Sequence, residues 1–309
     1  MDGIHAESVD EQMTEKVVKG FGAIQFREQQ PNAIREALTL ATNHFQTGKS
    51  KTMARIFITG STDGLGRMAA ELLIEQGHRV VLHARSQTRA EETKTNVPEA
   101  EAVVIGDLGT TAQTRKVAKQ VNALGAFDAV IHNAAVGYKE PKRIETEDGL
   151  SHVFAVNTMA PYILTALIAK PKRLVYLSSM LHQNGDPSLE DLTWKARAWD
   201  GEQAYSDTKL HDVLLAFGVA RRWPGVLSNA LEPGWVPTKM GGAEATDDLD
   251  QAHLTQVWLA ASDQPEALVT GEYFYHLSRK GTLPAAHSVA MQDRLLAICE
   301  RLSGIALPE

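Results

Sequence analysis

Cysteine is nearly absent from this 309-residue sequence, in which Cys299 is the single example. One cysteine excludes an internal disulfide framework and a zinc site built from several cysteines, so a reducing compartment is expected. Long hydrophobic runs are also missing: the longest, residues 160–169, is shorter than the ~18 residues of a membrane-spanning helix. The N-terminus lacks a basic end followed by an apolar stretch, so no signal peptide is predicted. We therefore expect a cytoplasmic protein without a membrane span.

An excess of positive charge is missing as well. The sequence has 31 Lys and Arg against 38 Asp and Glu, a net charge of -7, which argues against a general binder of nucleic acid. The histidines do not follow the HExxH spacing, and no metal site is predicted. What the chain has is 43% hydrophobic residues, enough for a sizeable buried core.

Short apolar segments alternate with longer amphipathic ones from Arg55 onward. The segments expected to be buried strands are residues 55–59, 79–84, 101–106, 127–132, 173–178 and 226–233. Helical periodicity is found in residues 67–77, 111–124, 150–169 and 206–222. This alternation predicts an α/β fold for residues 53–309: a doubly wound parallel sheet (Rossmann fold) with helices on both faces.

Residues 1–52 form a polar N-terminal extension of unknown role. It contains a possible helix at residues 31–45 and a basic linker at residues 47–52. The extension could be an upstream appendage, an arm that packs on the domain, or an artificial addition, and the sequence leaves these alternatives open. Its TGKS stretch resembles the end of a P-loop, but Asn43 stands where a glycine is needed and no buried strand leads into it. A solvated linker is the favoured interpretation.

A glycine-rich turn follows the first predicted strand and opens the first predicted helix. A pyrophosphate that approaches backbone N–H groups closely needs residues without Cβ, and the helix N-terminus adds favourable partial charge. This placement is typical of dinucleotide-binding proteins. The cofactor contacts predicted in this turn are Gly60, Ser61, Gly64, Leu65 and Gly66.

The spacing of the turn is TGxxxGxG, and with the motifs that follow it resembles the short-chain dehydrogenase/reductase family. The resemblance runs in order through most of the chain after Met53, by way of GDLG, HNAAVG, YSDTK and EPGWVPT. His132 and Ala135 depart from the family's NNAG segment. The resemblance implies a nicotinamide dinucleotide cofactor. Its implied contacts are Asp107 and Leu108 at the adenine, Asn133, Ala134 and Ala135 along the adenosine, and Pro233, Gly234, Val236 and Thr238 at the nicotinamide end.

The end of the second predicted strand indicates which dinucleotide is bound. Ala84 and Arg85 stand where an acid would hydrogen-bond the 2′-hydroxyl of the adenine ribose in NAD. An arginine accommodates a 2′-phosphate instead, so NADP(H) is predicted over NAD. Arg67 or His83 could share the contact with the phosphate.

Tyr205 and Lys209 lie four residues apart in a predicted helix, and taken alone they could be an aromatic and a base on one helical face. The family resemblance implies that they are catalytic, with Ser179 after the fifth strand and Asn157 on the preceding helix. Tyr205 would exchange a proton with the substrate oxygen, and Lys209 would lower the pKa of Tyr205 and hold the nicotinamide ribose. Ser179 would donate to the substrate oxygen and Asn157 would anchor a water. Ser178 is expected to end the strand.

Residues 180–204 resemble the longer loop of the retinol dehydrogenase-like and WW-domain oxidoreductase-like branch. The side chains that could wall an apolar substrate pocket are Met180, Leu181, Trp194, Trp199 and Trp235. Alternatively, Trp194 and Trp199 pin the loop onto the core. The predicted function is NADP(H)-dependent interconversion of a carbonyl and an alcohol, with a lipophilic aldehyde or ketone as substrate. A non-catalytic NADP-sensing protein is the alternative.

The family resemblance also implies a homodimer, in which two copies pair through the helices that carry Asn157 and Tyr205.

Overall fold

A computed structural model describes residues 52–309 of the chain. The described residues belong to one compact unit, Lys49–Glu309. The predicted N-terminal extension, with its helix and all of its linker except Thr52, lies outside the described residues. Among the described residues, no helix is long and apolar enough to cross a membrane.

An eight-stranded sheet forms the centre of the unit, in the order β3-β2-β1-β4-β5-β6-β7-β8. Its strands are β1 (Arg55–Ile58), β2 (Arg79–Ala84), β3 (Ala102–Ile105), β4 (Ala129–His132), β5 (Arg173–Leu177), β6 (Leu227–Glu232), β7 (Tyr273–Tyr275) and β8 (Ser278–Arg279). The first seven are parallel, and β8 pairs antiparallel with β7. The predicted doubly wound fold is confirmed, while β7 and β8 were not predicted.

The strands are apolar on both faces, which is why their sequences read as continuous hydrophobic runs. Successive side chains of a strand point to opposite faces. On β1, Phe57 accordingly joins one hydrophobic core, whereas Ile56 and Ile58 join the other. Both faces of the sheet are therefore covered by other parts of the chain.

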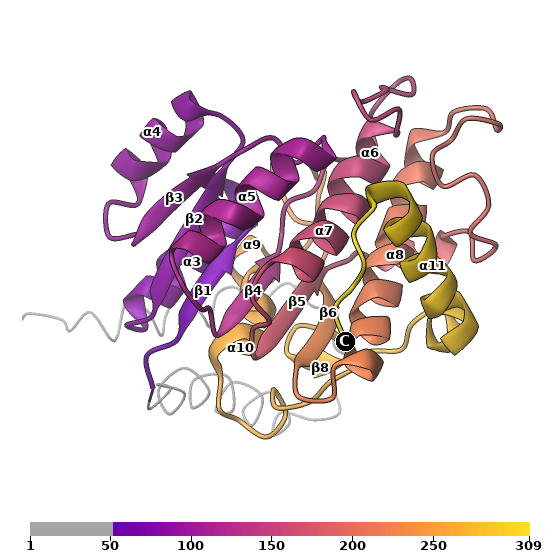
Figure 1. Cartoon of the computed structure of the whole chain (residues 1–309). Coiled ribbons are helices and arrows are strands. Elements are labelled where there is room, and N and C mark those ends of the chain that lie inside the picture. Colours follow the sequence, from indigo (N-terminus) through magenta and orange to yellow (C-terminus); the bar gives the residue numbers. More distant parts are fainter. Residues whose placement is uncertain (1–51) are drawn as a thin grey trace, which may run out of the picture. The chain divides into compact units, whose positions relative to one another are not determined.

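Helices provide that cover (Figure 1). The longer ones are α3 (Gly64–Glu75), α4 (Gln87–Asn96), α5 (Thr111–Ala123), α7 (Ala160–Leu167), α8 (Gly201–Arg222), α10 (Leu254–Ala261) and α11 (Val289–Ser303). The shorter ones are α6 (His152–Phe154), η2 (Ala155–Met159), η3 (Met180–Asn184), α9 (Leu249–Ala252) and η4 (Pro284–His287). The core that holds Phe57 includes side chains of α5, α7, α8 and α11, and the opposite core includes those of α3 and α10. Cys299 of α11 is buried, as expected of a small apolar residue.

The strand order reverses direction between β1 and β4, because the chain runs outward from β1 to β3 and then returns to the other side of β1. In doubly wound sheets, ligands bind outside the carboxyl ends of the strands at this switch point. The loops after β1, β2, β3, β4 and β6 reach this edge, and these loops together with the first turn of α3 carry all the predicted cofactor contacts that lie outside α8.

Candidate active site

The glycine turn lies at the carboxyl end of β1 and is packed against the segment after β4. Gly60 has φ +62°, and a Cβ there would lie 2.7 Å from Cα of Ala134. Asn133 braces the turn, since its Nδ2 donates to the carbonyls of Thr59 at 2.9 Å and Gly60 at 3.0 Å. A side chain at Gly60 would therefore clash with the segment after β4.

The N-terminus of α3 points its first N–H groups into this turn without a cap of its own. Asp63 occupies the N-cap position, but its side chain accepts no hydrogen bond from the helix. A glycine turn with free helix amides fits a phosphate group. Ser61 is fully buried, and its hydroxyl donates to Ile58 O at 2.9 Å and accepts from His83 N at 2.9 Å. The Ser61 hydroxyl therefore holds β1 to β2.

The residues around the end of β2 differ in their exposure and in their hydrogen-bond partners. Arg85 is exposed. His83 is buried, with Nδ1 accepting from Gly60 N at 3.1 Å and Nε2 within 2.8 Å of Gly106 O, so both ring nitrogens are used within the fold. Arg67 is paired with Glu71 one helical turn away. His83 thus has no ring nitrogen left for a phosphate, whereas Arg67 is paired through Nε alone and its part in phosphate binding stays a prediction.

A second arginine near Arg85, Arg89, was not predicted from the sequence. Arg89 lies in the first turn of α4, where it pairs with Glu92, and its guanidinium also contacts Thr62 Oγ1 at 3.0 Å and Asp63 Oδ2 at 3.1 Å. Lys239, from the loop after β6, reaches the same Asp63 oxygen at 2.6 Å. The glycine turn is therefore adjacent to α4 and to the loop after β6. The only sequence signal was an arginine four residues after Arg85.

The remaining predicted cofactor residues lie on the loops after β3, β4 and β6. These are Asp107, Leu108, Asn133, Ala134, Ala135, Pro233, Gly234, Val236 and Thr238. Leu108 and Val236 are buried, whereas Asp107 is exposed and its carboxylate accepts from Gly109 N at 2.8 Å. Gly234 has φ +90°, and Asp247 packs so closely that a Cβ there would lie 2.6 Å from its carboxylate.

The Ser179 hydroxyl lies near the Tyr205 side chain and favours its ionised form. Tyr205 lies in the second turn of α8, and Ser179 directly precedes η3. Burial raises the pKa of Tyr205 above 10.0, while the nearby Lys209 ammonium and Ser179 hydroxyl lower it. Lys209 thus acts in the predicted direction, but burial outweighs it in the protein alone.

Lys209 is buried beneath Tyr205, with its Nζ 5.5 Å from the centroid of the Tyr205 ring. Its ammonium donates to Leu177 O at 2.7 Å and to Asp212 Oδ2 at 2.8 Å. Asp212 was not predicted as part of the site. The signal for it was an acid three residues after the lysine, on the same face of the helix.

Asn157 lies in η2, a π-helical turn where the helix ladder is widened. Such turns occur frequently at functional sites. Its Nδ2 donates to Val136 O at 3.0 Å and Thr208 Oγ1 at 3.1 Å, and its Oδ1 accepts from Val136 N at 2.8 Å. Both amide hydrogens are used in the fold, so Asn157 braces the site, and its side chain has no N–H left for the predicted water.

Ser178 and Ser179 have separate surroundings. The Ser178 hydroxyl is buried and donates to Lys209 O at 2.7 Å, which ties the end of β5 to α8. The carbonyl of Ser179 lies 2.7 Å from His182 Nδ1, and His182 Nε2 accepts from Leu283 N at 3.3 Å. This arrangement fixes the proton on Nδ1. His182 therefore holds the backbone of Ser179, a role not predicted from the sequence.

The side chains of Met240 and Tyr138 pack against Tyr205. Met240 Sδ lies 3.9 Å from the Tyr205 hydroxyl, and the Tyr138 ring lies edge-on at 5.6 Å. Neither was predicted. Among the predicted pocket residues, Met180 and Trp235 are exposed, at 61% and 45%.

Trp194 and Trp199 serve the alternative role that the sequence left open. They pack edge to face at 5.4 Å, and Trp199 Nε1 donates to Glu140 O at 2.9 Å. The Arg197 guanidinium stacks on Trp194 at 3.6 Å. These contacts pin the loop before α8 to the rest of the unit.

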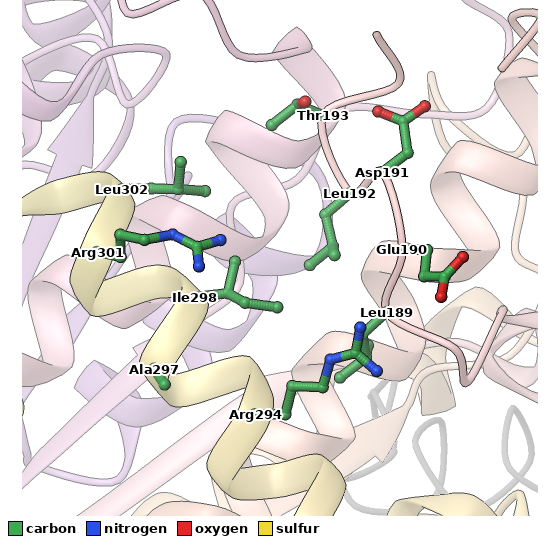
Figure 2. A pocket seen from close by; sticks show the side chains of 10 residues that line it. All are labelled: Leu189, Glu190, Asp191, Leu192, Thr193, Arg294, Ala297, Ile298, Arg301 and Leu302. Carbon is green, nitrogen blue, oxygen red and sulfur yellow. The ribbon is translucent and has the colours of Figure 1, made fainter. Parts of the chain in front are cut away.

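A separate pocket of about 480 Å³ opens between this loop and α11 (Figure 2). Arg294 and Arg301 approach it from α11, and Leu189 and Leu192 from the loop. None of the predicted catalytic or cofactor residues lines it. In the described part of the chain, no group of His, Cys, Asp and Glu is arranged to hold a metal ion.

Fold and site together define an oxidoreductase with a Rossmann fold. The model of the short chain dehydrogenase family matches residues 54–187. The uncharacterized oxidoreductase AN7799 of Emericella nidulans is 46% identical over 260 residues, which cover 83% of this chain and 99% of the relative. The short-chain dehydrogenase chyC of Penicillium rubens is 44% identical over 260 residues, 83% of this chain and 100% of the relative. The chain therefore belongs to the short-chain dehydrogenase family, and its substrate is a small molecule.

More distant relatives agree with the predicted branch and fold. Human retinol dehydrogenase 13 is 29% identical over 287 residues, 82% of this chain and 85% of the relative. The crystal structure of an uncharacterized protein from Mycobacterium Paratuberculosis superposes with a TM-score of 0.72 at 25% identity, covering 85% of this chain and 98% of the other. A gluconate 5-dehydrogenase from Burkholderia cenocepacia, solved with NADP and tartrate, has the same fold at a TM-score of 0.57 and 19% identity, covering 75% and 96%.

Proposed function

We propose that the protein interconverts a carbonyl and an alcohol with NADP(H), and that it works chiefly as a reductase of lipophilic aldehydes or ketones. The observation that carries this proposal is the meeting of three groups at the carboxyl edge of the sheet. The Ser179 hydroxyl lies near Tyr205, and the Lys209 ammonium lies 5.5 Å from the centroid of the Tyr205 ring.

The reduced nicotinamide, when bound, supplies the hydride. The chain must then supply a proton to the carbonyl oxygen, where negative charge develops. Tyr205 is the proton donor in this scheme. Ser179 donates a second hydrogen bond to the same oxygen, and the Lys209 charge favours the phenolate that Tyr205 leaves behind. Asn157 and His182 hold the segments that carry these groups.

Arg85 and Arg89 support the choice of NADP(H). Arg85 directly follows β2 and Arg89 lies in the first turn of α4, next to the strand end where the 2′-hydroxyl or 2′-phosphate of the adenine ribose is recognised in this kind of fold. Planar guanidinium groups suit a phosphate. Asp63 is also near, but its carboxylate is already paired with Arg89 and Lys239.

The choice of a lipophilic substrate is supported by side chains that contact Tyr205 and by apolar side chains exposed on two nearby loops. Met240 and Tyr138 contact Tyr205, and Met180 and Trp235 expose apolar surface in the loops after β5 and β6. A pocket walled by such residues binds apolar molecules, with the polar fixtures restricted to the reacting group.

Oxidation of NADPH over a panel of aldehydes and ketones tests the proposal. The wild-type protein should turn over at least one lipophilic member, and NADH should support a lower rate. A protein that binds NADPH tightly and turns over no member of the panel would instead be the NADP-sensing alternative. The intact Tyr205 and Lys209 pair favours the enzyme.

A homodimer and a cytoplasmic location stay predictions. The surfaces of α7 and α8 proposed for pairing are covered within the chain. Residues Ala204 to Ala220 of α8 are buried, α11 packs against α8, and Tyr162 of α7 donates to Ile305 O at 2.7 Å. Pairing through these helices requires α11 and the C-terminal segment to move aside.

A further inference from the structure

The buried ammonium of Lys209 has a counterion that the proposed chemistry does not use. Asp212 lies one turn further along α8, and its Oδ2 accepts from Lys209 Nζ at 2.8 Å. Both side chains are only 3% exposed. The second fixed partner of Nζ is Leu177 O at 2.7 Å, so one of three ammonium hydrogens is left for a ligand.

An ammonium with no counterion is costly in such a site. Burial lowers the pKa of a lysine by several units, to the point where the group is neutral in the physiological range. For Lys209 burial acts in that direction, but Asp212 and then Tyr205 raise its pKa above 10.5. Asp212 also fixes the direction of the ammonium, because its short side chain is held on the same helix.

We propose that Asp212 is a positioning residue that keeps the Lys209 ammonium charged and fixed beneath Tyr205, and that proton transfer by Tyr205 depends on it. The inference rests on the proposed function for the role of Tyr205. The dependence of the Lys209 charge on Asp212 rests on the ion pair alone.

The other titratable groups that face this pair are phenols. Tyr176 of β5 and Tyr273 of β7 face Asp212, and Tyr138 faces Tyr205. Burial raises the pKa of Tyr176 and of Tyr273, so both remain neutral and neither replaces the carboxylate. Glu232 of β6 is a further carboxylate near Tyr273, but it is paired with Lys280.

The first experiment measures the charge of Lys209 without any substrate. Protein labelled with ¹³C at the lysine ε-carbon is titrated by NMR, and the Lys209 signal is assigned by its loss in Lys209→Met. In Asp212→Asn the midpoint of Lys209 should fall by at least about one pH unit, the size of effect expected when a nearby opposite charge is removed. An unchanged midpoint overturns the proposal.

Asp207→Asn is the matched control. Asp207 is also a buried carboxylate of α8, but it pairs with Arg197 at 2.5 Å. Its replacement should leave the Lys209 midpoint in place while lowering the melting temperature. If Asp212→Asn does not fold, Asp212→Glu is titrated instead. The longer side chain should keep the charge on Lys209 but misplace it, giving a smaller fall of the midpoint, and an unchanged midpoint with unchanged turnover overturns the proposal.

The second experiment measures carbonyl reduction from pH 6 up to one unit above the Lys209 midpoint found in Asp212→Asn. Turnover by Asp212→Asn should fall as the pH passes the measured Lys209 midpoint and should recover when the pH is lowered, whereas the wild-type rate does not follow that midpoint. A variant that loses the Lys209 charge but keeps the wild-type pH profile overturns the link to Tyr205. A wild-type protein with no turnover contradicts the proposed function instead, and leaves the titration result standing.

Discussion

Replacement of Gly60 or Gly64 by alanine should have different costs, although both residues lie in the same turn with similar backbone angles. Their φ values are +62° and +53°. A left-handed conformation costs an alanine about 1 kcal/mol relative to glycine, and this cost applies equally to both.

The difference arises from what a methyl group would meet. At Gly60, it would lie 2.7 Å from Cα and 2.9 Å from Cβ of Ala134, whereas at Gly64 nothing lies within 4 Å. Because Ala134 Cα is backbone, the turn or the end of β4 must shift, and such overpacking costs about 1–3 kcal/mol. Gly64→Ala should therefore lose about 1 kcal/mol of unfolding free energy, and Gly60→Ala about 2–4 kcal/mol.

Equilibrium unfolding in urea measures both values, provided that the transition is two-state and its slope is unchanged. Equal losses for the two variants would refute the close approach of the glycine turn to the segment after β4. That result would also remove the packing reason for a glycine at this position.

Three further predictions concern the cofactor, the pH and the C-terminus. Arg89→Ala should weaken NADPH binding about 10-fold or more but leave NADH binding nearly unchanged, because one charge-assisted contact to the phosphate is lost, as fluorescence titration would show. Burial lowers the pKa of His132 from 6.5 to about 3, so the unfolded state binds the proton more tightly than the folded state. The free energy of unfolding should therefore decrease as the pH falls from 6.5 towards 3. His132→Phe should reduce that loss by up to about 1.4 kcal/mol per pH unit, measured by urea unfolding at several pH values. Deletion of residues 305–309 removes the carbonyls that accept from Tyr162 and Trp223. The deletion should lower the free energy of unfolding by about 1–3 kcal/mol for each buried group left without a partner. An unchanged melting temperature would contradict this prediction.

The sheet could be predicted because each strand from β1 to β6 is a short apolar run, and most of these runs are separated by segments with helical periodicity. Strands β7 and β8 are three and two residues long, with polar neighbours, and such short segments carry little periodic signal. Helix α4 was also missed, because its sequence QTRAEETKTN buries only Ala90 and Thr93.

The site could be predicted where a residue belongs to a motif with fixed spacing, as Tyr205 and Lys209 do. Contacts between distant segments gave no such signal. Met240 reaches Tyr205 from the loop after β6, and Leu283 donates its N–H to the His182 ring from a segment far along the chain. Burial was likewise invisible to the sequence, which is why the net rise in the pKa of Tyr205 was not foreseen.

The most direct test of the central claim compares Tyr205→Phe with Tyr138→Phe. Tyr138 lies against Tyr205, but it has no proposed part in proton transfer. Tyr205→Phe should retain NADPH binding and lose carbonyl reduction by about 100-fold or more, the usual contribution of a general acid, while Tyr138→Phe keeps most of the rate. Carbonyl reduction by Tyr205→Phe at close to the wild-type rate, with NADPH still bound, would contradict the account.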